Sequence, residues 1–309
     1  MARIPVLLAI VAVACADSAS SPVLPADPTP PASGVETLPD PDRLTLQPGS
    51  HEFTFREDRP ILVRYHLPAG YAPSTPIVFV MHGNGRTGDS YFRVWQQPAI
   101  DYGFLLVVPE FDAEQYPGSR SYNLGNIFPG EEPTSRNPES DWTFTAIEEL
   151  FDVMRVAAGS TRTAFRIYGH SAGSQFVHRL LMTRPEAPVE RAVAANAGWY
   201  TMPTEEVRWP YGLGESGFEL TSLAERFQQD VTILVGDQDT DPNHPGLRRT
   251  PEALAQGPHR LARGHTFYEV AETAAESLGV PFAWTFETVP GAEHRNSQMA
   301  PRAAAILAR

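Results

Sequence analysis

The chain has 309 residues, enough to bury the core of one large domain or of a domain with a small cap. Hydrophobic residues make up 42% of it and charged residues 20%, a balance typical of globular proteins and not of disordered ones. The net charge is -13, and all 24 basic residues are arginines that form no basic run. This excludes nucleic acid and anionic lipid surfaces as expected partners.

Cysteine and histidine are arranged in ways that predict neither a disulfide framework nor a metal site. The single cysteine, Cys15, has no partner within the chain. The nine histidines are scattered, none lies in a His-Glu-x-x-His pattern, and no Cys/His cluster has the spacing of a zinc site. We therefore expect no metal and no cofactor.

Residues 1–15 predict an export signal. One arginine precedes a short apolar run that ends in small residues, which is typical of a signal peptide and too short to span a bilayer. Ala12-Val13-Ala14-Cys15 resembles a bacterial lipobox, in which a lipid on Cys15 anchors the mature protein to a membrane. The alternative is ordinary cleavage between about Ala14 and Ala19, without a lipid. Both readings predict an exported protein, either secreted or held at the cell envelope.

Residues 16–42 predict a linker. They are rich in Pro, Ser, Ala and Asp, a composition that cannot bury a core and favours coil or polyproline conformations. We expect this segment to be disordered and to connect the export signal to one folded domain, residues 43–309.

Strands and helices alternate along the folded domain. Short β-branched or continuously apolar runs, bounded by turn residues, predict strands. The predicted strands are 51–55, 61–67, 77–81, 105–108 (ending before Pro109), 165–168, 191–196, 231–235 and 282–289. Helical spacing predicts helices at 91–102, 142–157, 175–182, 266–278 and 301–308. This alternation predicts an α/β fold with a mostly parallel sheet covered by helices on both faces.

Two stretches between these elements lack periodic apolar positions. Residues 110–140 are rich in Pro, Gly and Asn, and so long a loop in a compact domain is typically functional or disordered. Residues 197–229 are aromatic and irregular. We expect the second stretch to form a small irregular cap.

A nucleophile motif lies between the strand at 165–168 and the helix that follows it. Gly169-His170-Ser171-Ala172-Gly173 matches the G-x-S-x-G elbow, and it has the strand before it and the helix after it that the elbow requires. The turn is so sharp that Ser171 must take a strained backbone conformation, and a Cβ at Gly169 or Gly173 would clash. The alternative, a glycine-rich turn without chemistry, does not account for the other motifs.

The loop after the strand at 77–81 predicts a site for a developing negative charge. Its sequence is His82-Gly83-Asn84-Gly85, and its glycines allow the backbone to approach a substrate closely. We assign the oxyanion hole to the backbone N–H groups of Asn84 and Ala172. His82 is expected to orient the loop. The alternative is a plain strand-to-helix turn.

Two later loops supply candidates for an acid and a base. Asp237, Asp239 and Asp241 follow the strand at 231–235, and an aspartate three residues after Gly236 favours Asp239 as the acid. The other two aspartates are then expected to cap the loop. His294 follows the last strand and is the expected general base, which takes a proton from the serine and later gives it to the leaving group.

These four motifs, in the order Ser171, Asp239, His294 for the triad, resemble the α/β-hydrolase superfamily over about residues 50–309. Within it the chain resembles secreted bacterial esterases of the polyhydroxyalkanoate depolymerase and feruloyl esterase type. The resemblance implies an α/β-hydrolase fold with a mostly parallel eight-stranded sheet, and ester hydrolysis without a metal. The chain departs from those esterases in having no disulfide.

Aromatic residues are candidates for the wall of a substrate pocket. Trp199 and Tyr200 follow the strand after the elbow, and together with Trp142 they are the predicted substrate-binding residues. Trp209 and Tyr211 are further candidates. The alternative for each of them is ordinary packing in the core or cap.

The segment from Asn243 to Gly264 has no counterpart that the resemblance identifies. Arg248-Arg249 and Gln256-Gly257 within it could anchor a lid or touch the substrate, and we favour the anchor. No pair of positive charges is placed by the sequence to bind a substrate carboxylate.

Three functions remain to be compared. The favoured one is a serine hydrolase that cleaves carboxylic esters, including polyesters or aromatic esters, through a Ser-His-Asp triad and an acyl-enzyme. A serine peptidase or amidase with the same triad is the first alternative, because the elbow activates Ser171 for both kinds of bond. The second is a non-catalytic binding protein with a hydrolase fold. The expected partner is a small-molecule or polymeric ester.

Overall fold

The computed structural model describes residues 44–309, so the predicted signal peptide, Cys15 and the linker at 16–42 lie outside the described residues. Eight strands form one sheet: β1 (Gly49–Phe55), β2 (Ile61–Leu67), β3 (Ile77–Met81), β4 (Leu105–Glu110), β5 (Phe165–His170), β6 (Val189–Ala195), β7 (Asp230–Gly236) and β8 (Thr285–Val289). Their order is β1-β2-β4-β3-β5-β6-β7-β8. The two pairs that include β2 are antiparallel and the other five are parallel, as the predicted fold requires.

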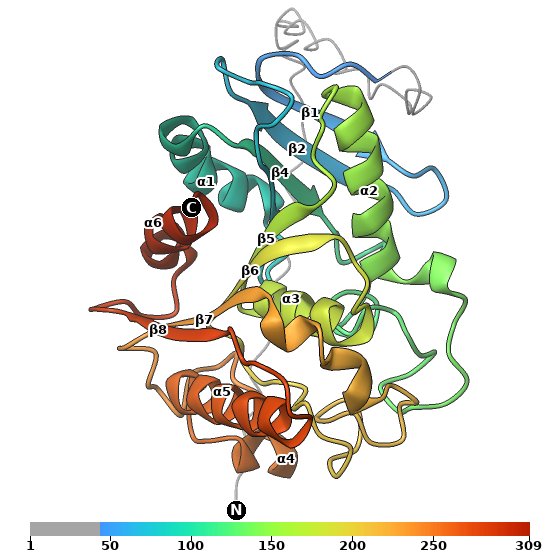
Figure 1. The fold of residues 1–309 in the computed structure, drawn as a ribbon, viewed down its shortest axis with the longest axis vertical. Coiled ribbons are helices and arrows are strands. Elements are labelled where there is room, and N and C mark those ends of the chain that lie inside the picture. Colours follow the sequence, from blue (N-terminus) through green and yellow to red (C-terminus); the bar gives the residue numbers. More distant parts are fainter. Residues whose placement is uncertain (1–43) are drawn as a thin grey trace, which may run out of the picture. The chain divides into compact units, whose positions relative to one another are not determined.

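Helices cover both faces of the sheet. The α-helices are α1 (Gly88–Tyr102), α2 (Thr143–Ala157), α3 (Ala172–Thr183), α4 (Pro251–Ala255), α5 (Arg260–Ser277) and α6 (Asn296–Leu307). Short 3-10 turns lie at Glu139–Asp141, Leu220–Leu223 and Arg226–Gln228. Helices α1 and α6 lie on one face, and α2, α3 and α5 lie on the other (Figure 1). The loops at the carboxyl ends of the parallel strands are therefore left to build a site.

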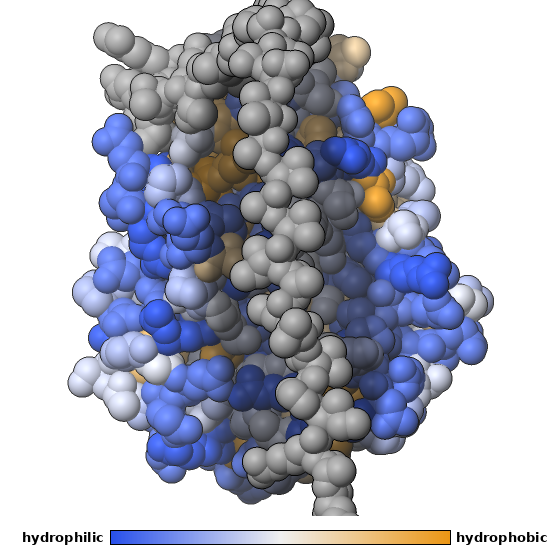
Figure 2. Space-filling view, turned by 180° about the vertical axis from the view of Figure 1, so that it is seen from behind, coloured by the Kyte–Doolittle hydropathy of each residue, from blue (hydrophilic) through white to orange (hydrophobic). Residues whose placement is uncertain are grey.

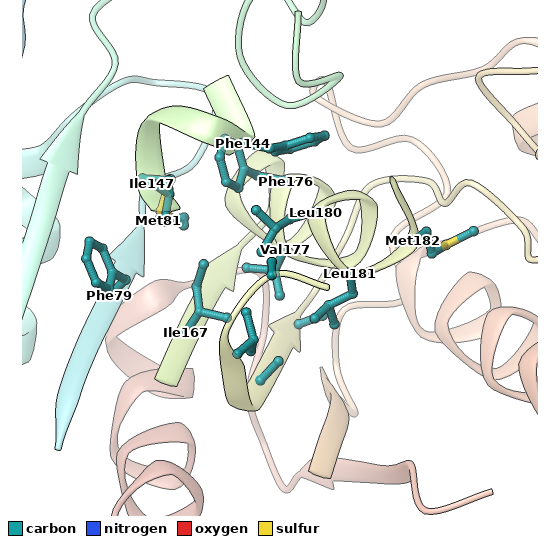
Figure 3. Packing of buried hydrophobic residues seen from close by; sticks show 14 of the residues in the cluster. Phe79, Met81, Phe144, Ile147, Ile167, Phe176, Val177, Leu180, Leu181 and Met182 are labelled. Atoms are coloured by element: carbon teal, nitrogen blue, oxygen red, sulfur yellow. The ribbon is translucent and has the colours of Figure 1, made fainter. Parts of the chain in front are cut away.

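The central strand β3 shows how the sequence produces these layers. All five of its residues are fully buried, and they alternate between two hydrophobic clusters. Phe79 and Met81 pack in the cluster below α2 and α3, whereas Val78 and Val80 pack in the cluster below α1 and α6. Figure 3 shows Phe79 and Met81 in the first cluster, together with side chains of α3. A run that is apolar at every position suits a strand buried on both faces.

Several predicted strand boundaries differ from those observed, and two of the differences have a clear physical cause. Strand β4 continues through Pro109 to Glu110. Its pairing with β3 ends at Val107, whereas its pairing with β2 continues, with Pro109 opposite Val63. At Pro109 strand β4 therefore has only one neighbouring strand, so the lack of a backbone N–H on the proline is tolerated. Strand β8 begins at Thr285 and not at residue 282, since the preceding residues leave the ladder and pack with Phe227.

Several helices begin earlier than predicted. The last helix begins at Asn296 and contains Pro301, whose exposed position leaves the freed carbonyl group open to water. Helix α3 begins at Ala172, directly after the predicted nucleophile. Helix α5 begins at Arg260, where the His259 ring accepts a hydrogen bond from the N–H of Ala262. Ring nitrogens are unusual N-caps, so no residue type at this position predicts the start of a helix.

The loop between β4 and α2 is ordered, although it has little regular structure. Tyr122, Asn123 and Phe128 are buried in it. Arg86, in the loop after β3, donates hydrogen bonds to its carbonyl groups, including that of Phe111. The loop is thereby fixed against the carboxyl end of the sheet.

The surface of the described residues is largely polar. The face in Figure 2 is mostly hydrophilic, with apolar colour in small separate patches. Large hydrophobic side chains are exposed at only four positions of residues 44–309: Ile100, Tyr102, Val156 and Leu254. Within the same range no helix combines the length and the apolar character needed to cross a membrane.

Candidate active site

Ser171 stands at the tip of a strained turn between β5 and α3. Its backbone has φ 58° and ψ -115°, a conformation that residues with a side chain rarely adopt. A Cβ at Gly169 would overlap the carbonyl oxygen of Gly173, and one at Gly173 would overlap that of Met81. Both glycines are therefore required by close backbone approach, as the elbow motif predicted.

The structure brings Ser171, His294 and Asp239 together from three loops that follow β5, β8 and β7. His294 Nε2 lies 3.0 Å from Ser171 Oγ, and His294 Nδ1 lies 2.7 Å from Asp239 Oδ2. The side chain of Asp239 is only 3% exposed. This chain of hydrogen bonds orients the imidazole so that its Nε2 can accept a proton from the hydroxyl.

The three aspartates after β7 lie in different environments. Asp237 accepts a hydrogen bond from the N–H of Gly291, and Asp241 accepts one from the N–H of Asn243. Both cap the loop, and only Asp239 reaches the imidazole.

The loop that carries His294 is fixed against the end of β7. Asn196, which follows β6, accepts a hydrogen bond from the N–H of Gly236 and donates one to the carbonyl of Glu293. A Cβ at Gly236 would overlap the carbonyl oxygen of Ala292. Asn196 thus positions the loop, a role that no sequence motif indicated.

The site favours a neutral His294. Burial lowers the pKa of His294 below its usual value, the hydrogen bond to Asp239 raises it, and the nearby charge of Arg260 lowers it again. The sum is a lowered pKa, so the ring can act as a base in weakly acidic solution.

A second histidine, His170, packs against the base. The two ring centroids are 4.7 Å apart, and His170 Nδ1 lies 2.9 Å from the hydroxyl of Tyr91. Burial holds the pKa of His170 well below its ordinary range, so the ring adds no positive charge beside His294.

The predicted oxyanion residues both line the pocket that contains Ser171. Ala172 is the first residue of α3, so its N–H has no acceptor within the helix. Asn84 is exposed in the loop after β3 and lines the same pocket as Ser171. His82 orients this loop as expected: it accepts a hydrogen bond from the N–H of Phe111, and burial lowers its pKa to about 4.

The pocket above Ser171 has a volume of about 520 Å³. It is lined by groups from the loops after β3, β4, β6 and β7. The lining includes Tyr91, Ser119, Asn123, Gln175, Trp199, His244, Leu247, Arg248 and Arg260. Most of these side chains can form hydrogen bonds, so the pocket suits a substrate with polar groups beyond the scissile bond.

Of the three predicted substrate-binding aromatics, only Trp199 lines this pocket. Tyr200 is fully buried, and its ring stacks on that of Phe267 in α5 with the ring centroids 4.4 Å apart. Trp142 is also buried, and its indole N–H donates to the carbonyl of Asn137. For Tyr200 and Trp142 the prediction was wrong, and the alternative, core packing, holds.

Two guanidinium groups lie close to the ring of Trp199. The guanidinium carbons of Arg179 and Arg248 lie 4.1 and 4.7 Å from its ring centroid. Arg248 also forms an ion pair with Glu131. Arg248 is therefore both a structural anchor and part of the pocket wall. The sequence alone had not indicated a cationic group in this position.

Arg260 and His244 are functional candidates that the sequence did not reveal. Arg260 is buried, and its Nη1 lies 3.3 Å from Asp239 Oδ1. The His244 ring lies 5.3 Å from that of His294. Neither residue belongs to a recognisable sequence motif.

Within residues 44–309, no group of three or more His, Cys, Asp or Glu side chains is arranged to hold a metal ion. The geometry described above instead presents an activated hydroxyl, a base and backbone donors in one pocket.

Solved structures resemble this chain along nearly all of the described residues. Poly(aspartic acid) hydrolase-1 from Sphingomonas sp. KT-1 is 40% identical with a TM-score of 0.82, and the match covers 85% of this chain and 100% of that one. LpqC, a poly(3-hydroxybutyrate) depolymerase from Bordetella parapertussis, is 37% identical with a TM-score of 0.78, covering 84% and 89%. An S-formylglutathione hydrolase from Agrobacterium tumefaciens, at 13% identity and a TM-score of 0.53, covering 84% and 94%, shares the fold. No family model and no curated protein sequence matches the chain.

Proposed function

Because the chain belongs to the α/β-hydrolase superfamily, in the group of the poly(aspartic acid) hydrolase and the poly(3-hydroxybutyrate) depolymerase, we propose that it is a serine hydrolase that cleaves carboxylic esters. The observation that carries this proposal is the continuous set of hydrogen bonds from Ser171 through His294 to Asp239. Its substrate is a small or polymeric ester, and its reaction uses this triad and an acyl-enzyme.

In the proposed reaction Ser171 Oγ attacks the carbonyl carbon while its proton passes to His294 Nε2. The N–H groups of Asn84 and Ala172 stabilise the oxyanion that forms, helped by the positive end of α3. His294 then gives its proton to the departing alcohol, which leaves an ester of Ser171. Water attacks this acyl-enzyme by the same route, with His294 again as the base. Asp239 keeps the imidazole in the correct tautomer and stabilises its charged form.

Amide hydrolysis is the second candidate, because the 40% identical structure is named for the hydrolysis of poly(aspartic acid). Arg248 in the pocket wall supports it, since a guanidinium binds carboxylate groups. The two candidates differ in the leaving group and share the nucleophile.

Replacing Ser171 by Ala tests the proposal. We expect turnover of p-nitrophenyl butyrate to fall by about 10⁴-fold or more, because no other group can attack the carbonyl. The matched control is Ser174→Ala, whose hydroxyl is buried one turn away on α3 and has no partner among the described residues. Peptide mass analysis after fluorophosphonate labelling should find the adduct on Ser171.

The same assay separates the two leaving groups. We expect the ester to be hydrolysed and the matching p-nitroanilide of butyric acid to be left intact. Faster cleavage of the anilide would replace the ester proposal by the amide one. A folded protein with neither activity and no adduct would favour a binding protein.

We also propose that the protein is exported and anchored to a membrane through a lipid on Cys15. The support is the short apolar run at residues 1–14 and the lipobox-like sequence that ends at Cys15. An anchored or secreted location suits an enzyme for ester substrates too large to enter a cell.

A further inference from the structure

One buried guanidinium joins the predicted acid to a second histidine. Arg260 Nη1 lies 3.3 Å from Asp239 Oδ1, and Arg260 Nη2 lies 3.2 Å from His244 Nδ1. The Arg260 side chain is 2% exposed. Asp239 uses its other oxygen for His294, so Arg260 connects two histidines that both face the pocket.

These contacts determine which nitrogen of His244 carries the proton. His244 Nδ1 is approached by Arg260 Nη2 and also by the backbone N–H of Gly246, at 3.1 Å. A guanidinium and a backbone N–H can only donate, so Nδ1 must be the acceptor. In the neutral ring the proton then lies on Nε2, which makes Nε2 a donor.

The loop holds this ring in place. Asp241 accepts a hydrogen bond from the N–H of Asn243, and Arg249 donates to the carbonyl of Pro242 and to the side chain of Asn243. The carbonyl of His244 itself accepts from the N–H of Leu247. The orientation of the donor therefore does not depend on the substrate.

The position of His244 indicates which part of a substrate it meets. Its ring lies 5.3 Å from the His294 ring, at an angle of 70°, and lines the pocket above Ser171. In the proposed mechanism His294 gives its proton to the leaving group. No hydrogen bond within the described residues uses Nε2 of His244, which leaves this donor available beside the departing alcohol.

We propose that His244 is a specificity-determining donor, whose Nε2–H binds an acceptor oxygen on the leaving alcohol of the substrate, with Arg260 as the residue that fixes its tautomer. This inference rests on the proposed ester hydrolysis and names a substrate class within it. Favoured esters carry a carbonyl or carboxylate oxygen on the alcohol side, as the repeating unit of a polyester does. An alcohol without such an oxygen makes no use of His244.

Two esters of butyric acid test this inference. The butyrate of sec-butanol lacks the acceptor, and the butyrate of methyl 3-hydroxybutyrate carries it on the leaving alcohol. In His244→Leu we expect kcat/KM to fall for the acceptor-bearing ester by roughly three- to tenfold more than it falls for the sec-butyl ester. This difference corresponds to the loss of one hydrogen bond. His244→Gln should restore most of the difference, because its amide nitrogen can donate. The matched control His51→Leu, at an exposed position of β1, should change neither rate.

Three outcomes would overturn the inference. Equal losses for both esters would make His244 a structural residue, and no loss for either would mean that it does not touch the substrate. A ring protonated on Nδ1, seen by nitrogen NMR of the histidine side chains, would remove the donor itself. In Arg260→Met the backbone N–H of Gly246 still donates to Nδ1, so we expect NMR to show a smaller fraction of His244 protonated on Nε2, without complete loss of that tautomer.

The proposed function has its own control in this design. Wild-type turnover of the sec-butyl ester depends on the triad and not on His244. If the wild-type protein did not hydrolyse the sec-butyl ester, this result would count against ester hydrolysis. The tautomer of His244 measured by NMR would still test the inference on His244.

Discussion

Two aspartates separated by one residue show how finely the site depends on single side chains. Asp239 is buried and bound to the imidazole, whereas Asp241 is exposed and caps a turn. We expect Asp239→Asn to lower kcat by about 10³- to 10⁴-fold, because an amide favours the wrong tautomer of His294. Asp241→Asn, the matched control, should stay within about twofold, since its capping oxygen is retained. The reverse ranking would assign the acid to Asp241.

The lowered pKa of His294 predicts the acidic limit of activity. The base must be neutral, so kcat/KM is lost as the pH falls through the pKa of His294 in the free enzyme. Because burial and Arg260 lower that pKa, the midpoint should lie below 6.5. Arg260→Gln removes one lowering charge and should move the midpoint to higher pH. The matched control, Arg295→Gln, removes an exposed arginine paired with Glu293 and should leave the midpoint in place.

The side chains that the sequence identified are those tied to a local backbone pattern. Ser171 is marked by two glycines that its turn requires, and His294 and the aspartates follow strands that are easily recognised. Arg260 and His244 depend on a contact between segments that lie 16 residues apart in the chain. No short sequence pattern encodes such a contact, so only the three-dimensional structure identifies these two residues.

Strands were easier to predict than helix ends, because continuous apolar runs such as β3 have one explanation in a parallel sheet. Helix starts depend on the cap, and α5 uses the ring of His259 where Ser, Thr, Asp or Asn would be expected. The irregular segment after β6 was the hardest part. Whether Trp199 or Tyr200 lines the pocket depends on packing against α5, which sequence does not reveal.

Gln256, which follows α4, anchors the irregular segment after β6. Its side-chain amide donates to the carbonyl of Tyr200 and accepts from the N–H of the same residue, and it is buried. We expect Gln256→Ala to lower the free energy of unfolding by about 2 kcal/mol or more, because two buried backbone groups lose their partners. Denaturant titration measures this value.

The matched control for Gln256 is Gln97→Ala. Gln97 is exposed on α1, and its side chain donates one hydrogen bond to Asp101 on the same helix, so the change should stay within about 0.5 kcal/mol. An equally small effect of Gln256→Ala would mean that water replaces the lost hydrogen bonds and that the segment is held by its aromatic packing.

The net charge and the polar surface of residues 44–309 offer no large apolar area that could attach the described part of the chain to a membrane. The net charge of -13 favours solubility, and the face in Figure 2 carries only small apolar patches. The predicted attachment to a membrane therefore depends on Cys15, which lies outside the described residues.

Cys15→Ser tests this attachment. In a bacterial host that processes lipoproteins, we expect the variant to move from the membrane fraction to the soluble fraction with its esterase activity unchanged, because a serine cannot take the lipid. Ser18→Ala, three residues later, is the control and should remain with the membrane. A wild-type protein that is already soluble would favour ordinary cleavage.

The pair of guanidinium groups around Trp199 gives the pocket an optical property. Indole fluorescence responds to nearby charge, and Trp199 is the one tryptophan of the described residues that lines the pocket above Ser171. A ligand that draws Arg248 away from the ring or displaces water from it changes the emission of this one indole, while the other four tryptophans of the chain remain as a constant background. Occupancy of the pocket can therefore be followed in the Ser171→Ala protein with unlabelled polymer fragments, without a coloured product.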